Sequence, residues 1–235
     1  MRHLDFEEIN SELLEYSNQI FGSLKIGIYI EEKFIERHNI ELKKREEKPP
    51  SFTDILKLEK YVSLFEDVNW FALIDNRVTT STVREMILSI CYGIFECYSL
   101  KTCRFAIMMI EENDMQYEEY GEIKKRLSEP DINIKLEDIP LYEDIQMVKN
   151  IRDIIIHIHS IVPRDPKQAD MKESYYINFK KYLESQCELV DDTSGQRIVI
   201  SKEYLHHALE VMLNYHRELT RRVYAFATSQ PYYDF

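Results

Sequence analysis

Glycine and proline are scarce in this chain, with five glycines and seven prolines among 235 residues. A phosphate-binding loop or a dinucleotide-binding fingerprint needs several glycines at fixed spacing, so this sequence can assemble neither. The scarcity of both residues also argues against a disordered chain. Charged residues make up 31% and apolar residues 44% of the sequence, which is typical of a helical globule with a sizeable core. We therefore predict a mainly all-α protein.

Cysteine is also infrequent, and three of the four cysteines, Cys91, Cys97 and Cys103, recur at six-residue intervals within one predicted helix. Successive members point about 120° apart around a helix, so this spacing fits neither a disulfide framework nor a zinc cluster. We interpret them, together with Cys187, as small buried apolar residues in a reducing compartment. The first residues lack the apolar core of a signal peptide, and no run reaches the roughly eighteen apolar residues of a membrane span. We therefore expect a cytoplasmic protein that does not enter the membrane.

Positive charge is in short supply, because the formal net charge at pH 7 is -12. Non-specific coating of nucleic acid depends on Lys and Arg side chains that neutralise phosphates, so this balance argues against that class of protein. Residues 111–146 contain twelve acidic and four basic residues and thus carry most of the excess negative charge. This acidic segment is a candidate surface for a protein partner such as a cognate antitoxin, and the remaining chain leaves room for a cleft that binds RNA.

Apolar periodicity predicts an antiparallel helical bundle with a small β-hairpin and a terminal helix near the C-terminus. The expected helices cover residues 6–40, 51–75, 82–110, 119–127 and 141–162, and a last helix follows residue 201. Gly22 and Gly27 are points where the first helix is expected to weaken or break. Thr82 and Glu85 have the spacing of a capping box at the start of the third helix. The turn-forming cluster Asp191–Gly195 lies between β-branched runs and predicts the hairpin.

These elements divide the chain into three parts. They are an N-terminal helical element with a charged linker (1–50), a helical bundle (51–165), and the hairpin with a C-terminal helix packed on the bundle (166–235).

The most apolar predicted helix, residues 141–162, also carries the residues with chemical content. Its apolar stripe consists of Leu141, Ile145, Val148, Ile151, Ile155, Ile158 and Val162. Arg152, Asp153 and His157 interrupt this apolar segment. Pro163 and the proline that follows it are expected to end the helix.

An arginine, a polar residue and then a histidine a few positions on, within long antiparallel helices, resembles the signature of the HEPN superfamily of helical nucleotide-binding and ribonuclease domains. Arg152, Asp153 and His157 fill that signature here, within residues 52–165. The resemblance implies a metal-independent endoribonuclease of toxin or antiviral-defence type, in which two motifs meet across the two-fold axis of a homodimer. One toxin subgroup carries a modified tyrosine two positions after the histidine. His159 stands at that position here, so this modification is not carried over.

The residue types suit RNA cleavage without a metal or another cofactor. RNA supplies its own nucleophile, the 2′-hydroxyl, so the protein must provide a base, a cation near the developing phosphorane charge and an acid for the leaving oxygen. A histidine can take or give a proton near neutral pH, which makes His157 a candidate base or acid. Arg152 can hold a phosphate by two parallel hydrogen bonds, and Asp153 can orient either partner.

His159 is an alternative catalytic residue. On a regular helix Arg152 and His159 share nearly the same face, whereas Arg152 and His157 point about 140° apart. For His157 to act with Arg152, the helix must begin, bend or tighten near Arg152, or the two-fold axis must bring Arg152 of one chain to His157 of the other. We expect His157 to border a solvent-accessible cleft and His159 to be the more buried of the two.

Three other interpretations remain open. The chain can be a catalytically inactive HEPN-like module that binds nucleotide or RNA, or a helical protein-interaction domain without a ligand. In the latter case Arg152 only pairs with a carboxylate at a helix interface, and the histidines have no chemical role. A metal site at His157 and His159 is the weakest alternative, because two residues at that spacing share a face on a strand but not on a helix.

Overall fold

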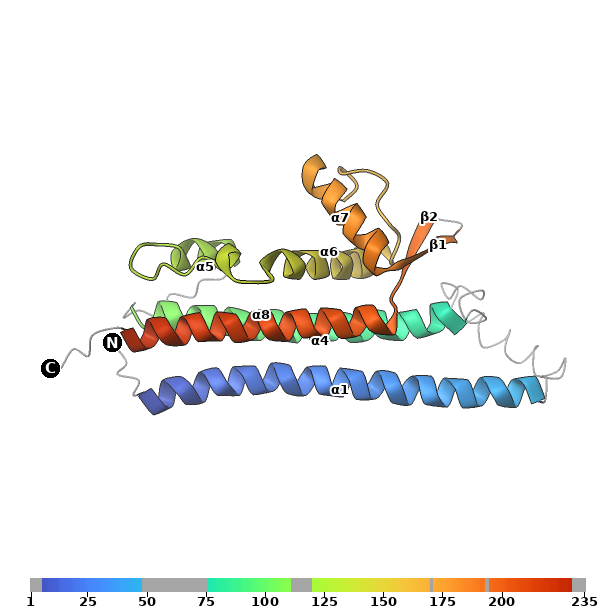
Figure 1. Cartoon of the computed structure of the whole chain (residues 1–235), viewed down its shortest axis with the longest axis horizontal. Helices are drawn as coiled ribbons and strands as arrows, with labels where there is room; N and C mark the ends of the chain where they lie inside the picture. The colour runs from blue at the N-terminus through green and yellow to red at the C-terminus, as the bar shows by residue number, and fades with distance from the viewer. Residues whose placement is uncertain (1–5, 48–75, 111–119, 170, 193–194, 230–235) are drawn as a thin grey trace.

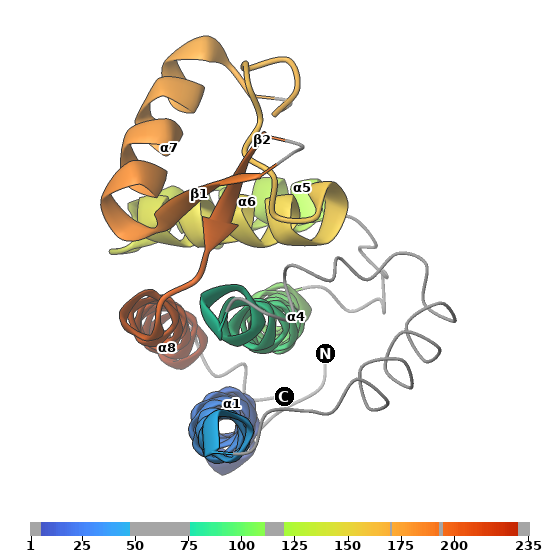
Figure 2. The same ribbon diagram turned by 90° about the vertical axis from the view of Figure 1, so that its right-hand side faces the viewer.

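The computed structural model describes residues 6–47, 76–110, 120–169, 171–192 and 195–229. Three long helices dominate it, α1 (Phe6–Glu47), α4 (Asn76–Met108) and α8 (Lys202–Ser229), and α4 and α8 both run antiparallel to α1 (Figure 1). Viewed end-on, these three helices form a triangle (Figure 2). The mainly helical fold with a small hairpin and a final helix is confirmed. The predicted helix at residues 51–75 lies outside the described residues.

Helix α1 is continuous through the two glycines at which a break was expected. It packs on α4 and α8 through a stripe that includes Leu13, Ile20 and Leu24. Gly27 belongs to the same contact, because a β-carbon there would lie 2.9 Å from Ile87 Cγ2. This glycine therefore permits close helix packing. The helix also extends to Glu47, through the residues that were expected to form a charged linker.

Helix α4 begins at Asn76, ahead of the expected capping box at Thr82. Glu85 does not cap the helix, and its buried carboxylate accepts hydrogen bonds from Ser81 Oγ and Ser160 Oγ, both at 2.9 Å. Its side chain thus joins α4 to the turn that follows α6 (Tyr142–Ile158).

A second layer lies across α4 and α8 on the side away from α1 (Figure 2). It consists of α5 (Tyr120–Leu127), a short 3₁₀ helix η1 (Leu136–Asp138) and α6. The apolar side chains of this layer complete the core, and the buried ones are Ile123, Leu127, Ile132, Ile134, Leu136, Ile139, Ile145, Val148, Ile151 and Ile154. Helix α5 agrees with the short helix that was predicted for the acidic segment.

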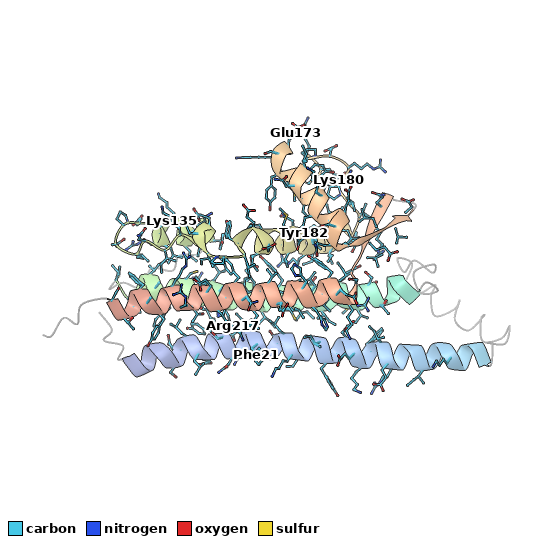
Figure 3. All side chains as sticks on the ribbon, in the orientation of Figure 1. Phe21, Lys135, Glu173, Lys180, Tyr182 and Arg217 are labelled. Carbon is cyan, nitrogen blue, oxygen red and sulfur yellow. The ribbon has the colours of Figure 1, made fainter. Side chains whose placement is uncertain are left out.

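Helix α7 (Glu173–Gln186) was not predicted, although its buried residues Tyr176, Phe179 and Leu183 have helical spacing. It stands on the bundle with Glu173 at its outer end (Figure 3). The hairpin follows, and β1 (Glu188–Asp192) pairs antiparallel with β2 (Gly195–Val199) as expected.

A polar network joins α1, α4 and the hairpin where the hairpin meets the bundle. The carboxylate of Glu31 on α1 is fully buried and accepts a hydrogen bond of 2.9 Å from Arg84 Nε on α4. Arg84 also donates to the carbonyl of Ile200, at 3.1 Å. A buried carboxylate needs such a charged partner, so this pair specifies how α1 is aligned with α4.

Three of the four cysteines, Cys91, Cys103 and Cys187, are buried as predicted, whereas Cys97 is exposed. Burial raises the pKa of the Cys91 thiol to about 11 and those of Cys103 and Cys187 to about 12, so these three stay protonated at neutral pH. In the part of the chain that the structure describes, no helix combines the length and apolar character needed to cross a membrane.

Candidate functional site

Arg152 lies in the middle of α6 and turns toward α4, not toward the open face of its own helix. Its guanidinium lies over the ring of Tyr92, 5.1 Å from the centroid, and its NH2 group is 3.6 Å from Glu96 Oε2. Its NH1 group donates a hydrogen bond of 2.6 Å to Asp153 Oδ1. The side chain is 19% exposed, so the arginine is a partly buried cation held between two carboxylates and an aromatic ring.

These contacts have the geometry expected if Arg152 pairs with a carboxylate at a helix interface. Glu96 supplies that carboxylate from α4, and Asp153 supplies a second one from α6. Arg152 Nε remains buried without a hydrogen-bond partner among the described residues. One donor of the guanidinium is therefore still unused, although the cation is already neutralised within its own chain.

His157 is exposed in the last turn of α6. The helix is continuous from Tyr142 to Ile158, so it neither begins nor breaks at Arg152. In a regular helix five positions correspond to a rotation of about 140° and a rise of about 7.5 Å. Within one chain, Arg152 and His157 therefore face different directions, and the structure does not bring them together.

His159 is exposed, as His157 is, so neither histidine is buried in the core. It is the C-cap of α6 in the left-handed conformation with φ 51, and Ser160 follows with φ 66. The helix therefore ends before His159, short of the expected end near Pro163. The prediction that His159 shares a face with Arg152 assumed a helix that continues through residue 159, so it does not hold once α6 ends at Ile158.

Contacts with the hairpin explain why α6 ends early. The carbonyl of Ser160 accepts a hydrogen bond of 2.8 Å from the amide of Ile198, and the amide of Val162 donates to the carbonyl of Gln196 at 2.7 Å. Ser160 Oγ donates to Glu85. Two successive non-glycine residues in the left-handed region are strained, and these bonds offset the strain.

The apolar stripe of α6 is rotated slightly from the predicted one. The buried residues are Ile145, Val148, Ile151 and Ile154. Ile155 and Ile158 are only partly buried, and Leu141 is exposed. Ile156, the residue before His157, is 44% exposed, so some apolar surface is uncovered near the end of α6.

A cavity of about 110 Å³ lies beside Arg152, between α4, α5, η1, α6 and α8. Four aromatic rings line it, those of Tyr92, Phe95, Tyr120 and Tyr215. Glu96, the same carboxylate that approaches Arg152, also lines it. Sequence reasoning missed this cavity, and the only available signal was the i,i+4 spacing of Tyr92 and Glu96 on the predicted third helix.

Part of the predicted acidic surface is neutralised within the chain. Arg126 makes two hydrogen bonds of 2.8 Å to the Asp131 carboxylate and one of 3.0 Å to Glu129. The bonds from Arg126 lower the pKa of Asp131. Lys124 lies 3.5 Å from Glu137. Less unpaired negative charge is therefore available to a basic partner than the composition of residues 111–146 indicates, and residues 111–119 lie outside the described part.

The described ranges contain no group of three or more His, Cys, Asp or Glu side chains arranged to hold a metal ion. His157 and His159 are thus not joined there by a third ligand. Comparisons with protein-family models, curated proteins and solved structures gave no significant match to this chain. A functional interpretation therefore rests on the residues themselves.

Proposed function

We propose that this chain is a cytoplasmic, metal-independent endoribonuclease of toxin or defence type. Its cleft forms between two copies of the chain, so that Arg152 of one copy faces His157 of the other. The observation that carries this proposal is the exposed His157 beside the exposed Ile156 on the last turn of α6. An exposed imidazole next to an exposed isoleucine is suited to a site that a second subunit completes.

The proposed chemistry needs few groups. His157 takes the proton of the 2′-hydroxyl or gives one to the leaving oxygen, and Arg152 stabilises the charge on the phosphorane. Asp153 keeps the guanidinium in place through its hydrogen bond of 2.6 Å. The phosphate would have to compete with Glu96 for Arg152. The Glu96 contact of 3.6 Å is the longer of the two ion pairs, so it is the one we expect to yield.

A second candidate function is RNA or nucleotide binding without cleavage. It is favoured by the pairing of Arg152 with Glu96 and Asp153, because a cation that is already neutralised stabilises a transition state less effectively. Wild-type protein that shifts RNA in a salt-dependent gel assay without cutting it would support this alternative.

The test of the proposed activity is incubation of the purified protein with single-stranded RNA in the presence of a chelator. We expect cleavage that leaves a 2′,3′-cyclic phosphate, whereas single-stranded DNA stays intact because it lacks the nucleophile. His157→Ala should reduce the rate about a hundredfold or more without lowering the melting temperature, because it removes a proton-transfer group from an exposed position.

His159→Asn is the matched control, because asparagine tolerates the left-handed conformation at this position. It should keep most of the activity. Full activity in His157→Ala would disprove the proposed role of His157. Activity that is lost with chelator and restored by a divalent metal would contradict the metal-independent mechanism.

A further inference from the structure

The cavity beside Arg152 has a lining of unusual chemistry for a protein core. Its walls hold three tyrosine rings and one phenylalanine ring, and its charged lining residues are Glu96 and Lys149. Tyr120 is 43% exposed and connects the lining to the surface. A concave, mostly aromatic space with a few convergent polar groups is the usual form of a small-molecule site.

We propose that this cavity binds a small organic cation, in which a quaternary or alkylated ammonium group lies against the aromatic rings and faces the carboxylate of Glu96. The negative face of an aromatic ring attracts such a cation, and the Glu96 carboxylate, which Arg152 approaches only to 3.6 Å, adds negative charge. This site shares Glu96 with the surroundings of Arg152, but the binding it predicts does not require the proposed ribonuclease activity.

Neighbouring tyrosines already contact positively charged groups. Tyr92, which lines the cavity, carries the guanidinium of Arg152 at 5.1 Å from its ring centroid. Tyr142, whose ring centroid is 6.5 Å from that of Tyr215, accepts a hydrogen bond of 3.2 Å at its hydroxyl from the Lys124 ammonium. Both tyrosines belong to the same aromatic cluster, so positively charged groups already lie beside it.

The electrostatic environment of the cavity is consistent with a cationic ligand. Burial raises the pKa of both Tyr92 and Tyr120 above the usual value for tyrosine, and the negative charge of Glu96 adds a smaller increase at each, which Arg152 partly offsets at Tyr92. These phenols therefore stay neutral at physiological pH, and Glu96 is close enough to affect both. The net charge of the chain, -12, adds a long-range field that attracts cations.

The size of the cavity limits the ligand. One water position occupies roughly 10–15 Å³ of such a volume, so about 110 Å³ accommodates roughly seven to eleven non-hydrogen atoms. Choline is at the lower end of this range. A complete nucleotide is too large, although its base alone would fit, and Lys149 would then favour its phosphate. A bound cation should depend on Glu96, whereas a bound nucleotide should depend on Lys149. Variants of these two residues therefore distinguish the two kinds of ligand.

The experiment measures binding of choline to the full chain by NMR titration. The control ligand is 3,3-dimethylbutan-1-ol, which has the same shape as choline without the charge. We expect choline to bind at least tenfold more tightly than the neutral alcohol. Equal affinity for the two compounds, or no choline binding at tens of millimolar, would overturn the proposal.

Two pairs of variants test the residues. Tyr120→Phe should keep choline affinity within about twofold, whereas Tyr120→Leu should weaken it at least fivefold, because only the first keeps the ring. Glu96→Gln should weaken choline binding at least fivefold, and Lys149→Gln should leave it unchanged or tighten it. Preference for uridine monophosphate over choline, weakened by Lys149→Gln, would identify the cavity as a nucleotide site and refute the cation proposal. Because binding is measured directly, an absence of RNA cleavage would leave this result unaffected.

Discussion

His216 shows how burial alone sets the charge state of a single residue. It lies on α8 with no exposed surface, and its two ring nitrogens are each 3.3 Å from a hydroxyl group, Ser99 Oγ on α4 and Thr220 Oγ1 on α8. The loss of water around the ring lowers its pKa to about 4. The folded protein therefore contains a neutral histidine across the physiological range.

This burial predicts a loss of stability in mild acid. The unfolded chain protonates His216 near pH 6.5, whereas the folded chain keeps it neutral until about pH 4. Its contribution is thus fully present above pH 6.5 and is lost as the pH falls toward 4. We expect the free energy of unfolding in urea to fall by about 2 kcal/mol between pH 7 and pH 5 because of this residue.

His216→Gln is the variant that checks this effect, because glutamine can bond to the same hydroxyls and does not titrate. Its stability should fall less between pH 7 and pH 5 than that of the wild type. An equal fall in both proteins would mean that another group causes the acid sensitivity.

At the scale of a helix, the two glycines of α1, Gly22 and Gly27, have different roles. A β-carbon at Gly27 would lie 2.9 Å from Ile87 Cγ2 and 3.1 Å from Cys91 Sγ, whereas one at Gly22 would meet nothing within 4 Å. Alanine is a better helix former than glycine by about 1 kcal/mol, and crowding in a packed interface costs about 1–3 kcal/mol. Only Gly27 is required by the contact between α1 and α4.

We therefore expect Gly22→Ala to stabilise the protein by up to about 1 kcal/mol. Gly27→Ala should be less stable than Gly22→Ala by about 1–3 kcal/mol, because α4 must shift to admit the methyl group. Urea denaturation of both variants measures the difference. Equal stability of the two would show that α1 and α4 do not approach each other as closely as described.

At the scale of the whole molecule, large apolar side chains are exposed on several helices, α1, α4, α6 and α7 among them, and two of these faces bear on the proposed dimer. One is the end of α6, where Ile156 lies beside His157. The other is the outer face of α1, with Ile26 60% and Tyr29 59% exposed. α1 and α6 lie on opposite sides of α4 and α8 (Figure 1), so one two-fold axis through α6 would leave the α1 face uncovered.

The proposed composite site requires a homodimer through α6. Sedimentation should give about twice the chain mass of 28.3 kDa. Ile156→Glu should produce a monomer and abolish RNA cleavage, because it places a charge in the apolar contact. Ile26→Glu, on α1, should remain dimeric and active.

The opposite pattern, a monomer from Ile26→Glu and a dimer from Ile156→Glu, would show that α1 forms the interface. The two motifs would then be too far apart to share a cleft. A wild-type chain that is monomeric at micromolar concentration would exclude the shared site as well.

The order of most helices and the hairpin could be predicted from the sequence, because both depend on local patterns. Helical periodicity marked α5 and most of α4, α6 and α8, and the turn cluster before Gly195 marked the hairpin. Helix α7 has comparable spacing and could have been found in the same way. The buried positions of Cys91, Cys103 and Cys187 also followed from residue type and spacing.

The surroundings of the candidate residues were decided by tertiary structure. Glu85 has the spacing of a helix cap, but its carboxylate binds Ser160, 75 positions later in the chain. The bond between Ser160 and Ile198 of the hairpin helps to end α6 before His159. Arg152 turns toward Glu96 because α4 packs against α6. Periodicity reports which face of a helix is apolar, whereas the partner of a polar side chain depends on which distant element packs against it.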